Sequence, residues 1–447
     1  MMIDPIPTFL VKECIDELLE LITEIINTSL ELGDMPDVLK HAKIKPLLKK
    51  LGMALEENNY RPVSNLSYIS KLIEEAVVIQ FNNHLKENNI DDIKQSAYKK
   101  YHSTETLLLK VKSDILMKMD KGDIVMLVLL DLSAAFDTID HEILLNRLEK
   151  RYGLTGTVLK WFRSYLTNRT QSVIIDDQES DKIPLKYGVP QGSKLGPLLF
   201  TAYIAELSEI VKKHGIDDEK FADDVELMLA FSPSSRETQL SARDQMIKCI
   251  EDVRKFLEDN KLSNNGDKTE FMIIGSPQQL KKVEIDSIVV GGVIIKVVDH
   301  ARNLGIIFDS KMSMGHQVKK VCKTGYFHIR NIAAIRNSLN KKDTKTITHA
   351  FVTSTLDYGN SLLYGISRKD LNKLQILQNS AARVVEKKRK YDHITETLKE
   401  LHWLPVEARI KYKILSYVWK SLNERAPKYL TSMLILKEGK KNLRSDK

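Results

Sequence analysis

The chain carries Ile124-Val125-Met126-Leu127-Val128-Leu129-Leu130 immediately before Asp131, and this stretch decides its fold. A short, continuous apolar run of this length is typical of a β-strand buried on both faces. Asp140 then opens a predicted helix through Leu148. A buried strand that delivers a carboxylate at its end is a common way to present a catalytic acid. A helix cap explains Asp137 and Asp140 but fits Asp131 poorly, so Asp131 is a candidate catalytic residue.

A second carboxylate cluster lies in Phe221-Ala222-Asp223-Asp224. The chain has four Asp-Asp pairs, at 91–92, 176–177, 217–218 and 223–224, and a solvated turn or a cap explains an isolated pair. The pair at 223–224 differs because Asp131 lies upstream of it. Two carboxylate clusters on separate strands can share two Mg²⁺ ions roughly 3.5–4 Å apart, an arrangement suited to phosphoryl transfer. An all-Asp donor set matches the preference of Mg²⁺ for hard oxygen ligands.

Between these clusters lies a shaped loop, Gly188-Val189-Pro190-Gln191-Gly192-Ser193-Lys194-Leu195-Gly196-Pro197. Its glycines allow a ligand or a base pair to approach the backbone closely. Pro197 suits the first turn of a helix, which we expect to run to about Val211. Helices are also predicted over 11–32, 69–85 and 104–119, and a hairpin over 171–187.

The charge is distributed unevenly. The net charge is +8, yet the first 35 residues hold eight acids and one base, whereas residues 311–350 hold nine bases and one acid. One-sided positive charge favours a polyanionic partner. The basic segment 40–50 is either a solvated face or a phosphate contact.

Three scattered cysteines exclude a disulfide framework or a zinc ribbon and fit a reducing, intracellular setting. We read no signal peptide and no membrane span.

Six motifs in order resemble the reverse transcriptase of non-LTR retrotransposons (LINE elements), closest to the jockey and chicken-repeat groups. The resemblance covers nearly the whole chain, down to Leu401-His402-Trp403-Leu404-Pro405. The motifs are the finger segments Asn59-Tyr60-Arg61-Pro62 and Gln95-Ser96-Ala97-Tyr98, and four palm segments: 129–137, 188–200, 221–224 and 260–270.

The resemblance implies an α+β fold of the right-hand polymerase type, with fingers, a split-βαβ palm, a helical thumb and a helical C-terminal extension. The implied divisions are an N-terminal helical extension over 1–58, fingers and palm over 59–275, a primer-grip hairpin region over 276–310, a basic helical thumb over 311–400 and a truncated C-terminal helical segment over 401–447.

It also implies roles for individual residues. Asp131, Asp223 and Asp224 would hold the metal ions, and Lys268 would protonate the leaving pyrophosphate. The residues expected to contact the nucleotide are Arg61, Lys99, Phe136, Gln191 and Gly192. On a predicted helix, Lys319, Lys323 and Arg330 form a basic stripe beside the apolar residues Val318, Cys322, Tyr326 and Ile329; this stripe would grip nucleic acid.

The implied reaction is RNA-directed DNA synthesis with two Mg²⁺ ions (Mn²⁺ is the alternative), an RNA template, a DNA primer and dNTPs. Nuclear localisation is the family expectation. An endonuclease domain such as relatives carry is not expected within this chain.

Several positions depart from the family pattern. The segment Gly215-Ile216-Asp217-Asp218-Glu219-Lys220 is polar where an apolar strand is usual, and Lys194 takes an apolar place. Phe221 replaces a tyrosine, Lys99 an arginine and Tyr101 a glycine. Extra acids beside a metal site would raise carboxylate pKa values. A relic that binds nucleic acid without turnover is therefore the alternative, while six ordered motifs argue against an unrelated structural protein.

Overall fold

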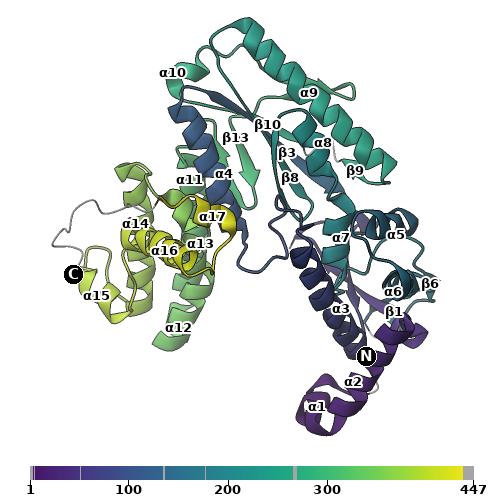
Figure 1. Cartoon of the computed structure of the whole chain (residues 1–447). Coiled ribbons are helices and arrows are strands. Elements are labelled where there is room, and N and C mark those ends of the chain that lie inside the picture. The colour runs from purple at the N-terminus through teal and green to yellow at the C-terminus, as the bar shows by residue number, and fades with distance from the viewer. Residues whose placement is uncertain are drawn as a thin grey trace, which may run out of the picture. The chain divides into compact units, whose positions relative to one another are not determined.

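The structure is a computed structural model that describes residues 4, 6–50, 52–133, 136–176, 178–264 and 269–435 (Figure 1). The chain divides into two compact units. The first comprises residues 1–98, 130–225 and 248–268, and the second comprises 99–129, 226–247 and 269–447. Three elements run from one unit into the other: β3 (Ile124–Ser133), β8 (Asp224–Phe231) and α9 (Arg236–Asp259).

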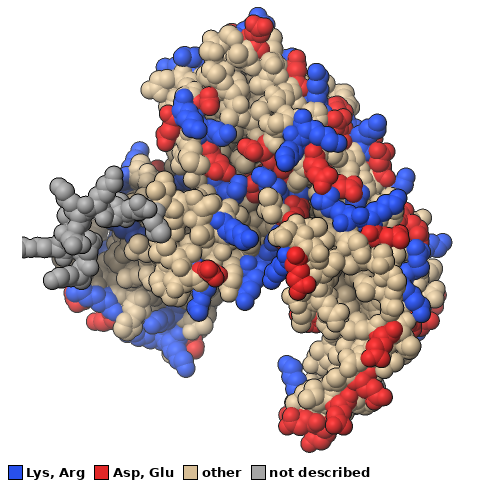
Figure 2. Space-filling view, in the orientation of Figure 1, with Lys and Arg blue, Asp and Glu red and all other residues tan. Residues whose placement is uncertain are grey.

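The first unit holds helices, among them an acidic pair at the N-terminus, and a mixed sheet. The helices are α1 (Thr8–Glu13), α2 (Ile15–Leu32), α3 (Tyr68–Glu87), α5 (His141–Lys150), α6 (Gly156–Leu166), α7 (Gly196–Ile204) and α8 (Leu207–Lys213). The strands are β1 (His41–Leu48), β2 (Tyr60–Asn65), β4 (Thr170–Ile175), β5 (Gln178–Glu179), β6 (Ile183–Pro184), β7 (Asp217–Phe221) and β9 (Ser263–Asn264). Acidic side chains gather over α1 and α2 (Figure 2), as the acid count of the N-terminal residues indicates.

One sheet of this unit has the strand order β2-β1-β4-β5, with β6 also paired to β4. Strand β1 is antiparallel to β2 and parallel to β4. The basic segment 40–50 thus contains a strand, although we expected helix for the N-terminal extension. Two of its lysines form ion pairs within this unit: Lys40 with Asp37 at 2.7 Å, and Lys43 with Glu179 at 2.9 Å. The proposed domain boundaries stay a prediction.

The second sheet is organised around β3 and has the order β10-β3-β8-β7, with β9 also paired to β3. The antiparallel register of β10 (Glu270–Ile274) on β3 runs from Glu270 opposite Leu129 to Ile274 opposite Val125. The apolar run of β3 is buried from Ile124 to Val128 and again at Leu130. The strand predicted from sequence is therefore confirmed, and Asp131 lies within it.

The second unit is mainly helical, with two small hairpins, β11–β12 and β13–β14. Its helices are α4 (Thr104–Asp120), α10 (Pro277–Leu280), α11 (Gly315–Ile335), α12 (Lys341–Thr348), α13 (Ser354–Asp357), α14 (Arg368–Glu386), α15 (Thr395–Glu400), α16 (Val406–Leu422) and α17 (Lys428–Ser432). The hairpin strands are β11 (Ser287–Val290), β12 (Val293–Lys296), β13 (His300–Asn303) and β14 (Ile306–Asp309). A turn of 3₁₀-helix, η6 (Asn360–Leu363), packs against α4 and α16.

Capping hydrogen bonds stabilise the first turns of two helices, at the starts that the sequence predicts. Ser103 and Thr106 form a reciprocal capping box at the start of α4, and the Asp140 carboxylate accepts hydrogen bonds from the N–H groups of Glu142 and Ile143. Two predicted helices are interrupted: the one over 11–32 breaks at Cys14, and the one from Pro197 divides into α7 and α8. No helix among the described residues is long and apolar enough to cross a membrane.

Candidate active site

The hairpin that carries Asp223 and Asp224 is held by a buried glutamine. β7 ends at Phe221 and β8 begins at Asp224, and Ala222 between them has φ +58°. Such a left-handed conformation costs a residue other than glycine about 1 kcal/mol. The Gln95 side chain, only 1% exposed, secures it: its Oε1 accepts from the Ala222 N–H (3.0 Å) and its Nε2 donates to the Ala222 carbonyl (3.3 Å). Gln95 thus fixes the corner from which the two carboxylates project.

The finger segment around Gln95 continues as an extended partner of β7. The Ser96 N–H donates to the Lys220 carbonyl (2.9 Å), and the Lys220 N–H donates to the Lys94 carbonyl (2.9 Å). Tyr98 follows this paired segment. Burial and then the charge of nearby Asp223 raise the pKa of the Tyr98 hydroxyl. The sequence motif 95–98 and the pair 223–224 therefore meet in the first unit.

The three candidate metal ligands lie on neighbouring strands of one sheet. Asp131 belongs to β3, Asp224 begins β8, and Asp223 directly precedes it. The side chains of Asp131 and Asp223 are half-buried and that of Asp224 is exposed. This all-carboxylate oxygen set is of the kind Mg²⁺ prefers, so the residues fit the ion that the sequence predicts. Among the described residues these carboxylates do not all lie within 4.8 Å of one another, whereas ligand atoms of Asp299, His300 and His316 do.

The loop containing Gln191 and Gly192 is docked on β2. The Ser64 N–H donates to the Gln191 carbonyl at 2.7 Å. Gly192 has φ +126°, and a Cβ there would lie 2.5 Å from the Ser64 carbonyl oxygen. Only glycine permits this approach, so Gly192 is required by packing as well as by any ligand.

The same loop binds the turn that follows β3. The Gln191 Nε2 donates to both carboxylate oxygens of Asp137, at 3.2 and 3.1 Å. The Val189 N–H donates to the Phe136 carbonyl at 2.9 Å, and the Phe136 ring packs on Phe200 with centroids 5.0 Å apart. Desolvation raises the pKa of Asp137, and the hydrogen bonds from Gln191 oppose that shift. Phe136, Gln191 and Gly192 are thus brought together, and their contact with a nucleotide stays a prediction.

A buried acid on α3 anchors the far end of the loop. Glu74 is fully buried and accepts from the N–H groups of Lys194 (2.6 Å) and Leu195 (3.2 Å). Burial raises the pKa of Glu74, while these hydrogen bonds lower it. The Lys194 side chain is 55% exposed and pairs with Glu75 at 3.0 Å, so this departure from the family pattern places no charge in the core.

The polar strand β7 is balanced by specific partners. Lys220 is fully buried and lies 2.7 Å from the Asp92 carboxylate and 3.9 Å from that of Asp218. Glu219 pairs with Lys94 at 3.2 Å, and the Ser208 hydroxyl donates to Asp218. Asp217 is exposed. The two buried acids, Asp218 and Glu219, are therefore engaged with residues outside the group Asp131, Asp223 and Asp224.

The other predicted site residues fall in separate places. Arg61 is exposed on β2, three residues before Ser64. Lys99 directly follows Tyr98 and is the first residue of the second unit, and Lys268 lies outside the described residues. Lys319, Lys323 and Arg330 are exposed on α11. The buried side of α11 includes Val318, Val321, Gly325, Ile329 and Ile332, so the apolar stripe differs from the prediction, and Tyr326 is exposed.

Sequence reasoning gave no role to Gln95, Glu74 or Asp137. Gln95 lies in a recognised motif, yet its position before Ser96 does not reveal a bond to Ala222, 127 residues away. Glu74 is preceded and followed by ordinary helix residues. The signal for Asp137 was present, since it follows Phe136 in the first palm motif, but a helix cap explained it equally well.

With this geometry in hand, comparisons with known proteins identify the class. The reverse transcriptase (RNA-dependent DNA polymerase) family matches residues 48–308. The chain therefore belongs to the reverse transcriptase family.

Particular relatives come from mobile elements of Drosophila melanogaster. A probable RNA-directed DNA polymerase from transposon BS is 27% identical over 86% of this chain and 42% of its own length. The RNA-directed DNA polymerase from mobile element jockey is 23% identical over 82% of this chain and 40% of its own length. The chain thus spans about two-fifths of these relatives. Among solved structures, a telomerase from Candida albicans is 14% identical with a TM-score of 0.41, covering 86% of this chain and 70% of that one.

Proposed function

We propose that this chain is an RNA-directed DNA polymerase of a non-LTR retroelement, copying an RNA template from a DNA primer with dNTPs. The observation that supports it best is the Gln95-held corner at Ala222, which presents Asp223 and Asp224 on the strand next to that of Asp131. Family membership supports only the class of enzyme. The corner at Ala222 supports Asp223 and Asp224 as its metal-binding residues.

The proposed roles follow from position. Asp131, Asp223 and Asp224 would hold two Mg²⁺ ions, which when bound would polarise the triphosphate and activate the primer hydroxyl. Phe136 packs on Phe200 beside the Gln191 loop and would lie against the sugar of the incoming nucleotide. Gln191 and the Gly192 backbone would bound the nucleotide pocket, and exposed Arg61 would contact its phosphates. Lys268 remains the proposed proton donor to pyrophosphate.

The relic alternative loses its main support. It depended on unbalanced acids in β7 and on Lys194. The buried charges of β7 and Lys194 have partners: Lys220 has Asp92, Glu219 has Lys94 and Lys194 has Glu75, while Asp217 is exposed to solvent. We therefore propose an active polymerase.

Primer extension on an RNA template with an annealed DNA primer, dNTPs and Mg²⁺ tests this function. Wild type and Asp217→Asn should extend, whereas Asp131→Asn and Asp223→Asn should not. Asp217 is the matched control because it is an exposed carboxylate at the start of the same hairpin. A wild type that binds the hybrid but does not extend it would overturn the proposal in favour of the relic.

A further inference from the structure

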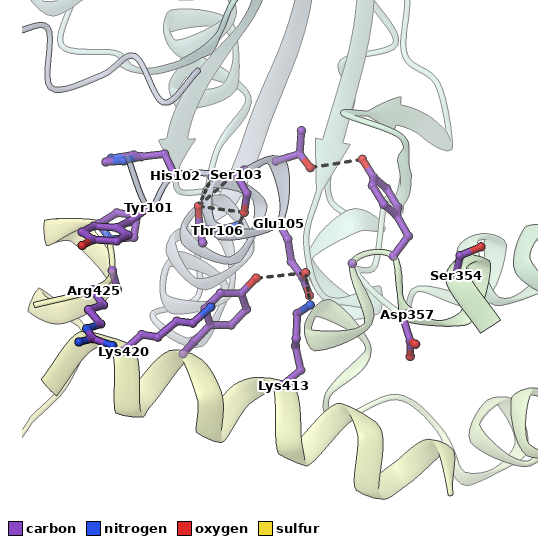
Figure 3. A pocket seen from close by; sticks show the side chains of 16 residues that line it. Tyr101, His102, Ser103, Glu105, Thr106, Ser354, Asp357, Lys413, Lys420 and Arg425 are labelled. Carbon is purple, nitrogen blue, oxygen red and sulfur yellow. Dashed lines mark hydrogen bonds and ion pairs between the residues drawn. The ribbon is translucent and has the colours of Figure 1, made fainter. Parts of the chain in front are cut away.

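A hollow lies in the second unit between the start of α4 and the C-terminal helix α16 (Figure 3). Its volume is about 690 Å³, and its walls come from residues 101–106, residues 354–359 and α16 with the turn after it. Small-molecule sites in proteins range from about 300 to 1,000 Å³, so the hollow has room for a nucleotide. None of the roles proposed above uses it.

The two acids on its walls are already neutralised. Glu105, 8% exposed, accepts hydrogen bonds from the Ser361 hydroxyl (2.5 Å) and the Tyr417 hydroxyl (3.1 Å) and lies 3.3 Å from the Lys413 ammonium. Asp357 is bound by Arg409, with nitrogen–oxygen distances of 2.8 and 2.6 Å. The carboxylates therefore cannot attract a cation and do not repel an anion strongly.

Two cations of the hollow have no acid to balance them. Within the part of the chain that the structure describes, Lys420 and Arg425 form no ion pair, and both side chains are exposed. Each lies against an aromatic ring: Lys420 is 5.7 Å from the Tyr417 centroid and Arg425 is 5.7 Å from the Trp419 centroid. Cations arranged on aromatic rings leave their outer N–H groups for an anion, and phosphate is the anion that suits them.

Tyr101 adds a planar surface at the same end of the hollow, where Figure 3 shows it with Lys420 and Arg425. It has φ +68° and is 46% exposed, at a position where the family resemblance leads one to expect glycine. A left-handed tyrosine is strained, and its exposed ring gains little from burial; its ring contact is the Lys100 ammonium, 4.9 Å from the centroid on one face. The strain has a use if the ring stacks on a ligand.

Phosphate-binding cations beside an exposed aromatic ring are the two features of sites for unpaired nucleic acid. We propose that this hollow binds a single-stranded stretch of RNA, with phosphates on Lys420 and Arg425 and a base stacked on Tyr101. A duplex would not fit this chemistry, because its base faces are covered by their neighbours. The choice of RNA rests on the proposed function, in which the template ahead of the primer is the unpaired strand.

The test measures fluorescence anisotropy of the whole chain with two probes, a labelled 20-nucleotide oligo(U) and an RNA–DNA hybrid duplex. Tyr101→Gly keeps a residue suited to φ +68°, so it removes the ring without opposing the fold. It should weaken oligo(U) binding about fivefold or more, since base stacking carries much of the affinity for single strands. Hybrid binding should change less than about twofold, because the duplex depends on other contacts.

The paired variant Lys420→Gln/Arg425→Gln should also reduce salt dependence. Loss of two phosphate contacts lowers the slope of log Kobs against log salt by about 1.4 for a single strand. Lys212→Gln/Lys213→Gln removes the same charge from exposed positions on α8, to which no binding role is assigned, and should leave both affinities unchanged. An oligo(DNA) of matched sequence shows whether the site prefers RNA; equal binding would overturn the choice of RNA.

The inference is overturned if Tyr101→Gly and the paired variant bind oligo(U) as the Lys212/Lys213 control does, or if oligo(U) and hybrid affinities fall by the same factor. Its failure is distinct from failure of the proposed function. A wild type that cannot extend a primer, yet binds oligo(U) in a manner that needs Tyr101, would remove the polymerase proposal and keep this site.

Discussion

Gln95 and Ala222, 127 residues apart in sequence, exchange two hydrogen bonds through the Gln95 side-chain amide and the Ala222 backbone. These hydrogen bonds stabilise the left-handed φ of Ala222, because without them the backbone would relax toward an extended turn. The position of Asp223 and Asp224 thus depends on a residue of the fingers motif.

We predict that Gln95→Ala lowers primer extension roughly 10- to 100-fold, since displacement of a reacting group by about 1 Å can cost this much. Gln80→Ala, on the exposed side of α3, is the control and should extend normally. The readout is the single-nucleotide addition rate, with circular dichroism at assay temperature to confirm folding. Full activity in a folded Gln95→Ala variant would show that the corner holds without the glutamine.

Gly192→Ala should weaken nucleotide binding by more than the strain of a left-handed backbone alone would. Its Cβ would meet the Ser64 carbonyl at 2.5 Å, which would push the loop of Gln191 off β2. Gly153→Ala is matched, because Gly153 also has a positive φ (+67°) but nothing within 4 Å of the added carbon. Both substitutions carry the left-handed penalty of about 1 kcal/mol. We expect only Gly192→Ala to raise the KM for dNTP in steady-state extension; equal effects would place the cause in backbone strain.

The sequence predicts a secondary-structure element well where the signal is local, as in an apolar run or a helix-capping residue. The apolar run before Asp131 indicated β3, and the helix starts predicted at residue 104 and at Asp140 are confirmed at α4 and α5. The small hairpins over 287–309 also lie within the region 276–310, where a hairpin was expected.

Long-range pairing was less accessible from sequence. The basic segment 40–50 gave no strand signal, because β1 is defined by partners 12 or more residues away, β2 and β4. Lys220 stood out as a departure because its partner Asp92 lies far upstream, in an Asp-Asp pair that a solvated turn or a cap explained. A buried charge can be judged only together with its counterion, and a single sequence does not show which residues meet.

Lys220→Met should destabilise the first unit by about 3 kcal/mol, because it leaves the Asp92 carboxylate buried without its cation. The double variant Asp92→Asn/Lys220→Met should recover much of this loss, since the amide oxygen can still accept from the Lys94 N–H. Lys194→Met breaks an exposed pair with Glu75 and should cost less than about 1 kcal/mol. Urea unfolding followed by circular dichroism measures all three. A double variant less stable than Lys220→Met would contradict the ion-pair explanation.

Lys112 on α4 provides a pH-dependent test of the second unit. Its ammonium donates to the Leu362 carbonyl at 2.5 Å, and burial lowers the pKa of Lys112 to about 8. The unfolded chain holds this proton up to its ordinary pKa of 10.5. Between these values the unfolded state binds more protons, so the free energy of unfolding should rise with pH from 8 to 10.5 and stay at its lower level below pH 8.

Lys112→Met should therefore stabilise the protein by about 1–2 kcal/mol at pH 7, a value reduced for partial exposure and for the lost hydrogen bond. The gain should shrink by pH 10, where wild-type Lys112 is neutral in the folded state. Lys121→Met, at an exposed position just after α4, removes a lysine from the same segment without relieving a buried charge. Urea unfolding at pH 7 and pH 10 gives the two differences. If the free energy of unfolding of both variants differs from that of wild type by the same amount at pH 7 and at pH 10, the Lys112 ammonium is solvated. Its burial then does not destabilise the folded state.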